Sequence, residues 1–168
     1  MKMEIIVLGS EILDGTVVDE FSYWIGKHLG DEHIMPTRVV IIEEENLRAE
    51  IISVLSTKRF DVLIIVCEFK PLKSDKILNL ISEVTGRRLL PNERILKTTR
   101  KDLLESLGKE IPVLPENADI IKNPKGASLG FKMATRYCEI YVLPKKLDEL
   151  RLMLKDLVIP DFKKKLAF

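Results

Sequence analysis

Short apolar runs alternate three times with amphipathic segments in the first half of the chain, and this alternation restricts the fold most. The apolar runs are rich in β-branched residues and typical of buried strands, over 3–9, 33–42 and 60–67. The segments that follow carry apolar residues at helical spacing and predict helices over 18–30, 43–59 and 74–86. Strands and helices in this order form a parallel sheet with right-handed crossovers and helices on both faces. We therefore predict an α/β fold, a three-layer sandwich with a mostly parallel sheet.

The second half of the chain is less regular. Its pattern predicts helices over 93–107 and 146–157, a strand over 137–144, and strands with loops over 111–133. A length of 168 residues suits one domain. We assign residues 1–160 to this domain and expect 161–168, with its run of lysines, to be a short solvated basic tail.

Composition narrows the class of protein. The net charge of +1 argues against a nucleic-acid partner, and no apolar run reaches the roughly 20 residues that span a bilayer. The first residues lack the long apolar segment of a signal peptide, so we expect a cytoplasmic protein without a membrane partner. The absence of glutamine and the 32% of charged residues indicate a thermophilic source. Cys67 and Cys138 are predicted to be buried free thiols, which fits a reducing compartment. The sequence does not decide whether they are instead close enough to form a disulfide.

Ligands of open parallel sheets bind at the carboxyl ends of the strands. The first such end has the sequence GSEILDG over 9–15, with a helix that starts near Asp19. Backbone amides at such turns and helix N-termini receive anions, so this stretch is a candidate binding site. The simpler interpretation is that Gly9 serves turn geometry and that Asp19 stabilises its helix.

Two further stretches are candidates for a site. The loop NPKGASLGF over 123–131 contains Gly126 and Gly130, which allow close approach of the backbone to another group. An ordinary surface loop would have the same composition. The segment LPKKLDEL over 143–150 ends a strand at Pro144 and begins a helix, which adds one more loop at the end of the sheet.

In order and spacing, these stretches resemble the molybdopterin-binding domain family. That family includes molybdenum-cofactor biosynthesis proteins and, closer to this chain, the N-terminal domain of CinA-type competence/damage proteins. It has Gly-Asp-Glu-Leu-Leu-x-Gly and then Asp-Thr-Asn, where this chain has 9–15 and 19–21. Its Asn-Pro-x-Gly-Thr-Ala-Pro-Gly-Phe corresponds to 123–131, and its Leu-Pro-Gly-x-Pro-x-Glu-Met to 143–150. The resemblance covers nearly the whole chain and implies the same three-layer α/β fold.

The resemblance fails at the end of the third strand. The family has Gly-Gly-x-Gly-Pro-Thr-x-Asp-Asp there, a phosphate loop whose glycines let backbone amides point at the anion. This chain has CEFKPLKSD over 67–75 and keeps only Pro71 and Asp75 of the pattern. The side chains of Cys67, Glu68 and Lys70 would partly fill the phosphate space, and Glu68 would repel a phosphate.

The resemblance implies a small phosphorylated ligand, molybdopterin or a nucleotide, together with Mg²⁺. The positions that match the family's motifs are the candidate ligand-binding residues: Gly9, Glu11, Asp19, Pro71, Asn123, Gly126 and Gly130. Asp75 is the candidate catalytic acid, and Asp75 with Glu43 or Glu11 would supply oxygen ligands to Mg²⁺. The family also implies a homo-oligomer, either a dimer or a trimer.

Three functions are compatible with these residues. In the first, the domain binds a pterin or nucleotide phosphate weakly or not at all, and catalysis is lost. In the second, it is an active Mg²⁺-dependent nucleotidyltransferase or pyrophosphatase. In the third, it keeps only the fold and acts as an oligomeric interaction protein. The enzyme needs Asp75 and a second acid within reach of one Mg²⁺. A binder needs an open pocket with free amides near Gly9 and Gly126. An interaction protein predicts that loop side chains fill the pocket, namely Phe69, Lys70 or Glu68.

Overall fold

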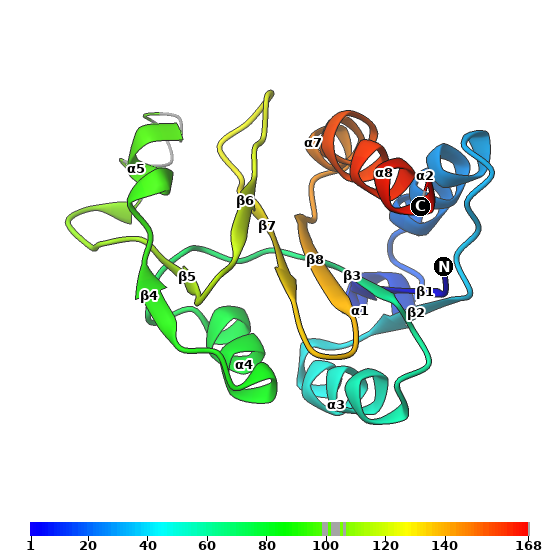
Figure 1. The fold of residues 1–168 in the computed structure, drawn as a ribbon, viewed down its shortest axis with the longest axis horizontal. Helices are drawn as coiled ribbons and strands as arrows, with labels where there is room; N and C mark the ends of the chain where they lie inside the picture. The colour runs from blue at the N-terminus through cyan, green and yellow to red at the C-terminus, as the bar shows by residue number, and fades with distance from the viewer. Residues whose placement is uncertain (99–100, 102–104, 106, 168) are drawn as a thin grey trace.

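The structure of the chain is a computed structural model that describes residues 1–98, 101, 105 and 107–167 (Figure 1). The first half contains, in order, β1 (Met3–Leu8), α1 (Ser10–Leu13), α2 (Glu20–Asp31), β2 (Arg38–Ile42), the 3₁₀ turn η1 (Glu44–Asn46), α3 (Leu47–Thr57), β3 (Val62–Cys67) and α4 (Lys76–Thr85). The second half contains β4 (Leu89–Pro91), α5 (Glu93–Thr98), β5 (Val113–Pro115), β6 (Asp119–Ile121), β7 (Gly130–Ala134), β8 (Glu139–Pro144), α7 (Leu147–Met153), the π-helical segment η2 (Leu154–Val158) and α8 (Ile159–Leu166).

The central sheet has six strands in the order β2-β1-β3-β8-β7-β6. Strands β2, β1, β3 and β8 are parallel, whereas β7 and β6 add an antiparallel edge. A separate antiparallel pair, β4 and β5, projects with α5 away from this sheet (Figure 1). The prediction of a mostly parallel α/β sheet is confirmed.

Helices cover both faces of the sheet, as predicted (Figure 1). One face packs on α3 and α4 through buried side chains that include Ile51, Leu78 and Phe131. The other face packs on α2, α7, η2 and α8, with a separate set of buried side chains that includes Ile25 and Phe162. Every residue of β1 and β3 is buried, because successive side chains of a strand point to opposite faces and both faces are covered.

The carboxyl end of the chain differs from the predicted tail. Helix α8 crosses the expected boundary at residue 160 and continues to Leu166. Pro160 lies in its first turn, directly after η2, and Phe162 is fully buried against the sheet. Its lysines also form ion pairs, Lys163 with Glu32 and Lys165 with Glu139. The segment 161–166 is therefore part of the packed structure.

Two other predicted elements end differently in the structure. Of the helix expected over 93–107, residues 93–98 form α5, and the positions 99–100, 102–104 and 106 lie outside the described residues. The helix expected to end at 157 continues as the π-helical η2 and then as α8.

The two cysteines are buried free thiols, as one of the two interpretations predicted. Cys67 pairs in register with Pro144, whereas Cys138 precedes Glu139, which pairs with Val62. The two thiols therefore lie at opposite ends of neighbouring strands, too far apart for a disulfide. None of the described helices is long and apolar enough to cross a membrane.

Candidate ligand-binding site at the carboxyl end of the sheet

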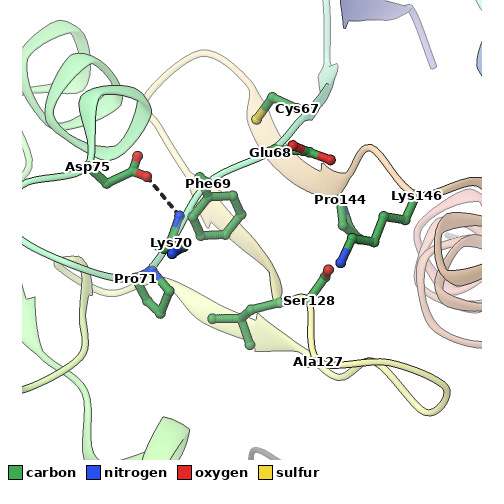
Figure 2. A pocket seen from close by; sticks show the side chains of 11 residues that line it. Cys67, Glu68, Phe69, Lys70, Pro71, Asp75, Ala127, Ser128, Pro144 and Lys146 are labelled. Carbon is green, nitrogen blue, oxygen red and sulfur yellow. Dashed lines mark hydrogen bonds between the residues drawn. The ribbon is translucent and has the colours of Figure 1, made fainter. Parts of the chain in front are cut away.

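Two hollows lie side by side where the parallel strands end. The first, here the β3–β8 cavity, has a volume of about 510 Å³ and is lined by residues 67–71 and 127–129 with Asp75, Pro144 and Lys146 (Figure 2). The second, here the β1 cavity, has about 540 Å³ and is lined by residues 8–11 with Phe21, Glu44, Glu68, Ile77 and Lys145. Glu68 lines both, so the hollows meet at the end of β3. Both volumes are typical of small-molecule sites.

The loop after β3 packs onto the protein core. Phe69 is half-buried and meets the ring of Phe131 edge to face, with centroids 5.4 Å apart. Pro71 is buried, and its carbonyl accepts a hydrogen bond from Val113 N at 2.8 Å. Figure 2 shows the Phe69 ring near its centre. The contacts of Phe69 and Pro71 anchor the loop to the rest of the protein.

Asp75 serves the backbone with both of its carboxylate oxygens. Its Oδ1 accepts from Leu78 N at 3.0 Å and caps helix α4, while its Oδ2 accepts from Lys70 N at 2.8 Å. The second bond closes the loop between β3 and α4 (Figure 2). The candidate catalytic acid therefore has a complete structural role at the helix N-terminus.

The structure does not bring Glu43 into a hollow with Asp75. The Glu43 side chain is exposed, and a hydrogen bond with Glu45 raises the pKa of its carboxyl. The neighbouring Glu44 instead lines, with Glu68 and Asp75, a shallower hollow of about 350 Å³. Among the residues that the structure describes, no group of three His, Cys, Asp or Glu side chains could hold a metal ion.

At the end of β1, a lysine engages the candidate residue Glu11. Lys145 Nζ forms an ion pair with Glu11, and this hydrogen bond lowers the pKa of the Glu11 carboxyl. The amide of Gly9 donates to the carbonyl of Ile42 at 3.0 Å, so it is not directed at the β1 cavity. A β-carbon on Gly9 would lie 2.9 Å from Ile12 Cδ1, which gives this glycine a packing role.

The loop over 123–131 is held together by its own side chains. Asn123 Oδ1 accepts from the amides of Lys125 and Gly126, each at 3.0 Å, and Asn123 Nδ2 donates to Glu149 Oε2 at 2.7 Å. A β-carbon on Gly126 would lie 1.6 Å from Glu149 Oε1. Asn123 and Gly126, which match the family's motif, therefore dock this loop onto helix α7.

Gly130 and Asp19 also have structural roles. A β-carbon on Gly130 would lie 2.7 Å from Met153 Cε and 3.0 Å from the carbonyl oxygen of Val142. Asp19 caps helix α2, since its Oδ1 accepts from Ser22 N at 3.0 Å. Neither residue lines the β3–β8 cavity or the β1 cavity.

Charges of both signs alternate around the two hollows. Four carboxylates line them or the hollow beside α4: Glu11, Glu44, Glu68 and Asp75. Four lysines face these acids: Lys70, Lys76, Lys145 and Lys146. Burial, followed by the nearby carboxylates of Asp75, Glu44 and Glu68, raises the pKa of the Cys67 thiol. The Cys67 side chain is consequently held in its uncharged thiol form.

Sequence reasoning missed several residues that line the hollows, chiefly Glu44, Ser128 and Lys146. Figure 2 shows the Lys146 side chain directed toward the hydroxyl of Ser128. Position was the available signal for Glu44 and Lys146, since each stands two residues after the end of a predicted strand, at Ile42 and Pro144. No signal in the sequence distinguishes Ser128 from its neighbours.

The fold and the edge hollows define an α/β domain with a ligand-type site at the carboxyl end of a parallel sheet. No model of a protein family matches the chain. A CinA-like protein of Geobacter metallireducens is 31% identical over 95% of this chain and 40% of its own length. A protein of Pyrococcus furiosus is 29% identical over 95% of this chain and 69% of its own length. The chain thus spans well under half the length of the CinA-like relative.

Solved structures show the same fold. The protein CinA of unknown function from Thermoplasma acidophilum matches with a TM-score of 0.75 at 20% identity, over 95% of this chain and 96% of that one. The molybdopterin biosynthesis enzyme MoaB of Thermus thermophilus matches with a TM-score of 0.61 at 15% identity, over 99% of this chain and 94% of that one. The chain is thus similar in sequence to CinA-like proteins, and it has the fold of CinA and of molybdopterin biosynthesis proteins such as MoaB.

Proposed function

We propose that this domain is a non-catalytic member of the molybdopterin-binding domain family that binds a pterin or nucleotide phosphate weakly or not at all. One observation carries the proposal: the groups that would hold the phosphate and Mg²⁺ are already bonded within the protein. Both oxygens of Asp75 accept from backbone amides, and the amides of Gly9 and Gly126 donate to protein oxygens. A phosphate would have to displace the bonds that the amides of Gly9 and Gly126 donate, and each is worth about 1 kcal/mol.

The side chains at the end of β3 support the same proposal. Glu68 lines both hollows and would repel a phosphate in either one. Lys70 and Lys146 offer positive charge in the β3–β8 cavity, but as flexible point charges without a cradle of amides. The side chains that line the two hollows carry charges of both signs, so they suit an uncharged or zwitterionic small molecule better than a pyrophosphate. Asp75 with Glu44 or Glu68 would be the acids that hold Mg²⁺ if a nucleotide brought it to the site.

The test is calorimetric titration with molybdopterin, ATP and ADP-ribose, each with and without Mg²⁺. We expect no dissociation constant below about 100 μM, because the amides and the carboxylate are engaged. The informative variant is Asp75→Asn, since asparagine still caps a helix while it loses the charge that a metal needs. The control is Asp19→Asn, which makes the same substitution at the cap of α2 and lies outside both hollows, although only Asp75→Asn also loses a second bond, the one from Lys70 N.

A micromolar dissociation constant that weakens at least tenfold in Asp75→Asn, and not in Asp19→Asn, would overturn the proposal. That outcome would favour the active Mg²⁺-dependent nucleotidyltransferase or pyrophosphatase. Release of pyrophosphate or AMP from the bound nucleotide would then identify the reaction.

We also propose that the domain works as a homo-oligomer, a dimer or a trimer, in the cytoplasm. Large apolar side chains exposed on the described surface support this proposal, among them Val18, Met35 and Ile111 at 80%, 79% and 64% exposure. The buried thiols of Cys67 and Cys138 fit a reducing compartment. Light scattering on purified protein should give two or three times the protomer mass of 19.3 kDa, and a single protomer mass at micromolar concentration would reject an oligomer.

A further inference from the structure

A further cavity lies on the opposite face of the sheet from α3 and α4. It has a volume of about 430 Å³ and is enclosed by the edge strand β6, by β7 and β8, and by η2 with the start of α8. None of the residues that line it lines the β3–β8 cavity or the β1 cavity. We call it the α8 cavity. Its volume lies in the range of sites for small molecules and is too small for a folded partner.

The lining of the α8 cavity combines an apolar part with charged side chains. Ile121, Tyr141 and Val158 are buried members of the core on this face, exposed by 5%, 1% and 0%. Leu157 and Pro160 complete the wall from the helical side. Leu157 is 38% exposed and Pro160 half-buried, so an apolar or aromatic body of a ligand would remove the surface of these two side chains from water, which is the main driving force for small-molecule binding.

An internal network neutralises the acid inside the cavity. Asp161 Oδ2 hydrogen-bonds the Tyr141 hydroxyl at 2.6 Å, Lys132 Nζ at 2.9 Å and Lys165 Nζ at 3.3 Å. Partial burial opposes ionisation of Asp161, but the bonds from Tyr141 and Lys132 outweigh it and lower the pKa of this carboxyl. Burial, together with Asp161, raises the pKa of the Tyr141 phenol, which stays a neutral donor. Asp161 thus has no lone charge to offer a ligand.

Positive charge remains at the rim of the cavity. Lys122, Lys132 and Lys164 line it, against only Asp156 and Asp161, and Asp161 is already neutralised by Lys132 and Lys165. The Lys122 ammonium group has no ion pair or hydrogen bond with a residue that the structure describes. Lys164 acts on Asp161 only through its charge. An anionic group at this rim would meet two lysines that need no release from a partner.

The backbone beside the cavity is unusual as well. Segment η2 is π-helical over five residues, and three of these, Asp156, Leu157 and Val158, line the cavity. Pro160 follows and has no backbone N–H, so the α-helical bond to the carbonyl of Asp156 is impossible and the turn widens. Short π-helical segments recur at functional sites.

We propose that the α8 cavity binds a small organic anion with an apolar body and one carboxylate or phosphate head. The body lies against Leu157 and Pro160, and the head lies at the rim between Lys122 and Lys164. This site is distinct from the edge hollows in its residues, and it does not depend on the function proposed for them.

The test uses phenyl phosphate, benzoate and the neutral benzyl alcohol as probes, followed by amide chemical shifts of the ¹⁵N-labelled full chain. We expect saturable shifts at 120–122 and 157–164 with a dissociation constant of about 1 mM or lower for phenyl phosphate. Benzoate should shift the same amides, and whichever of the two binds more tightly identifies the head group. Benzyl alcohol should bind at least tenfold more weakly.

Lys122→Gln and Lys164→Gln should each weaken phenyl phosphate about fivefold, because each removes one charge from the rim. The matched control is Lys163→Gln, which changes the neighbouring lysine of α8 whose partner is Glu32 and which does not line the cavity. The proposal fails if the shifts do not saturate, or if they fall only on residues of the edge hollows. It also fails if Lys163→Gln weakens binding as much as Lys164→Gln does.

Discussion

Gly126→Ala should destabilise the domain by about 1 to 3 kcal/mol, and removal of the Glu149 side chain should restore most of that loss. The added β-carbon would lie 1.6 Å from Glu149 Oε1 and 2.2 Å from Glu149 Cδ. The carboxylate must therefore move, and it gives up its 2.7 Å bond from Asn123 Nδ2. The measurement is urea unfolding of Gly126→Ala, Glu149→Ala and the double variant, read as a double-mutant cycle.

The matched control is Gly30→Ala. Gly30 lies in helix α2, where a β-carbon would meet no atom within 4 Å, so alanine should stabilise by about 0.5 to 1 kcal/mol. A Gly126→Ala variant as stable as the parent, or a cycle without coupling to Glu149, would contradict the structural role. Gly126 would then have to be kept for a ligand, which would favour the phosphate-binding interpretation of its loop.

Glu4→Gln should remove a pH dependence of stability that one buried carboxyl creates. Glu4 is fully buried on β1, and its Oε2 accepts from Arg38 NH1 at 3.0 Å, while its Oε1 has no partner in the structure. Burial, helped by the nearby carboxylate of Glu50, raises the pKa of Glu4 from 4.5 to about 7, although Arg38 opposes the shift. The carboxyl is therefore harder to ionise in the folded protein than in the unfolded chain.

The sign of the effect follows from this raised pKa. Below pH 4.5 the carboxyl is protonated in both states and costs nothing, and stability falls as the pH rises from about 4.5 to about 7. Above pH 7 the folded protein carries the full cost, on the order of 2 to 3 kcal/mol. Glutamine has no such titration, so Glu4→Gln should exceed the parent by about 2 kcal/mol at pH 8 and equal it near pH 4.5.

Urea unfolding at pH 4.5, 6, 7 and 8 measures this difference. Glu83→Gln is the matched control, since Glu83 also pairs with an arginine, Arg48, but is 61% exposed. Glu83→Gln should change the free energy of unfolding by no more than about 0.5 kcal/mol at every pH, as for other exposed ion pairs. A constant offset between Glu4→Gln and the parent over the whole pH range would refute the assignment of the titration to Glu4.

The sequence was sufficient for the parallel half of the fold. A strand buried on both faces needs a continuous apolar run, and the helices beside it need apolar residues at helical spacing, so 60–67 and 74–86 could be assigned locally. The antiparallel edge of β6 and β7 and the pair β4 and β5 were harder to predict from the sequence, because these strands have three to five residues and little periodicity. Phe162 also looked like part of a tail, since only its contact with the sheet reveals that it is core.

For the site, the sequence by itself determined which residues stand at the ends of the strands and that the glycine phosphate loop is replaced over 67–75. It could not determine what those residues are bonded to. Gly9 N donates to the carbonyl of Ile42, Asn123 donates to Glu149, and Lys145 donates to Glu11. The two partners of each bond are 26 to 134 positions apart in the chain. Only the tertiary structure brings such groups together, because hydrogen bonds depend on distances in space that no local pattern encodes. It therefore decided that the best-matched motif residues serve the fold.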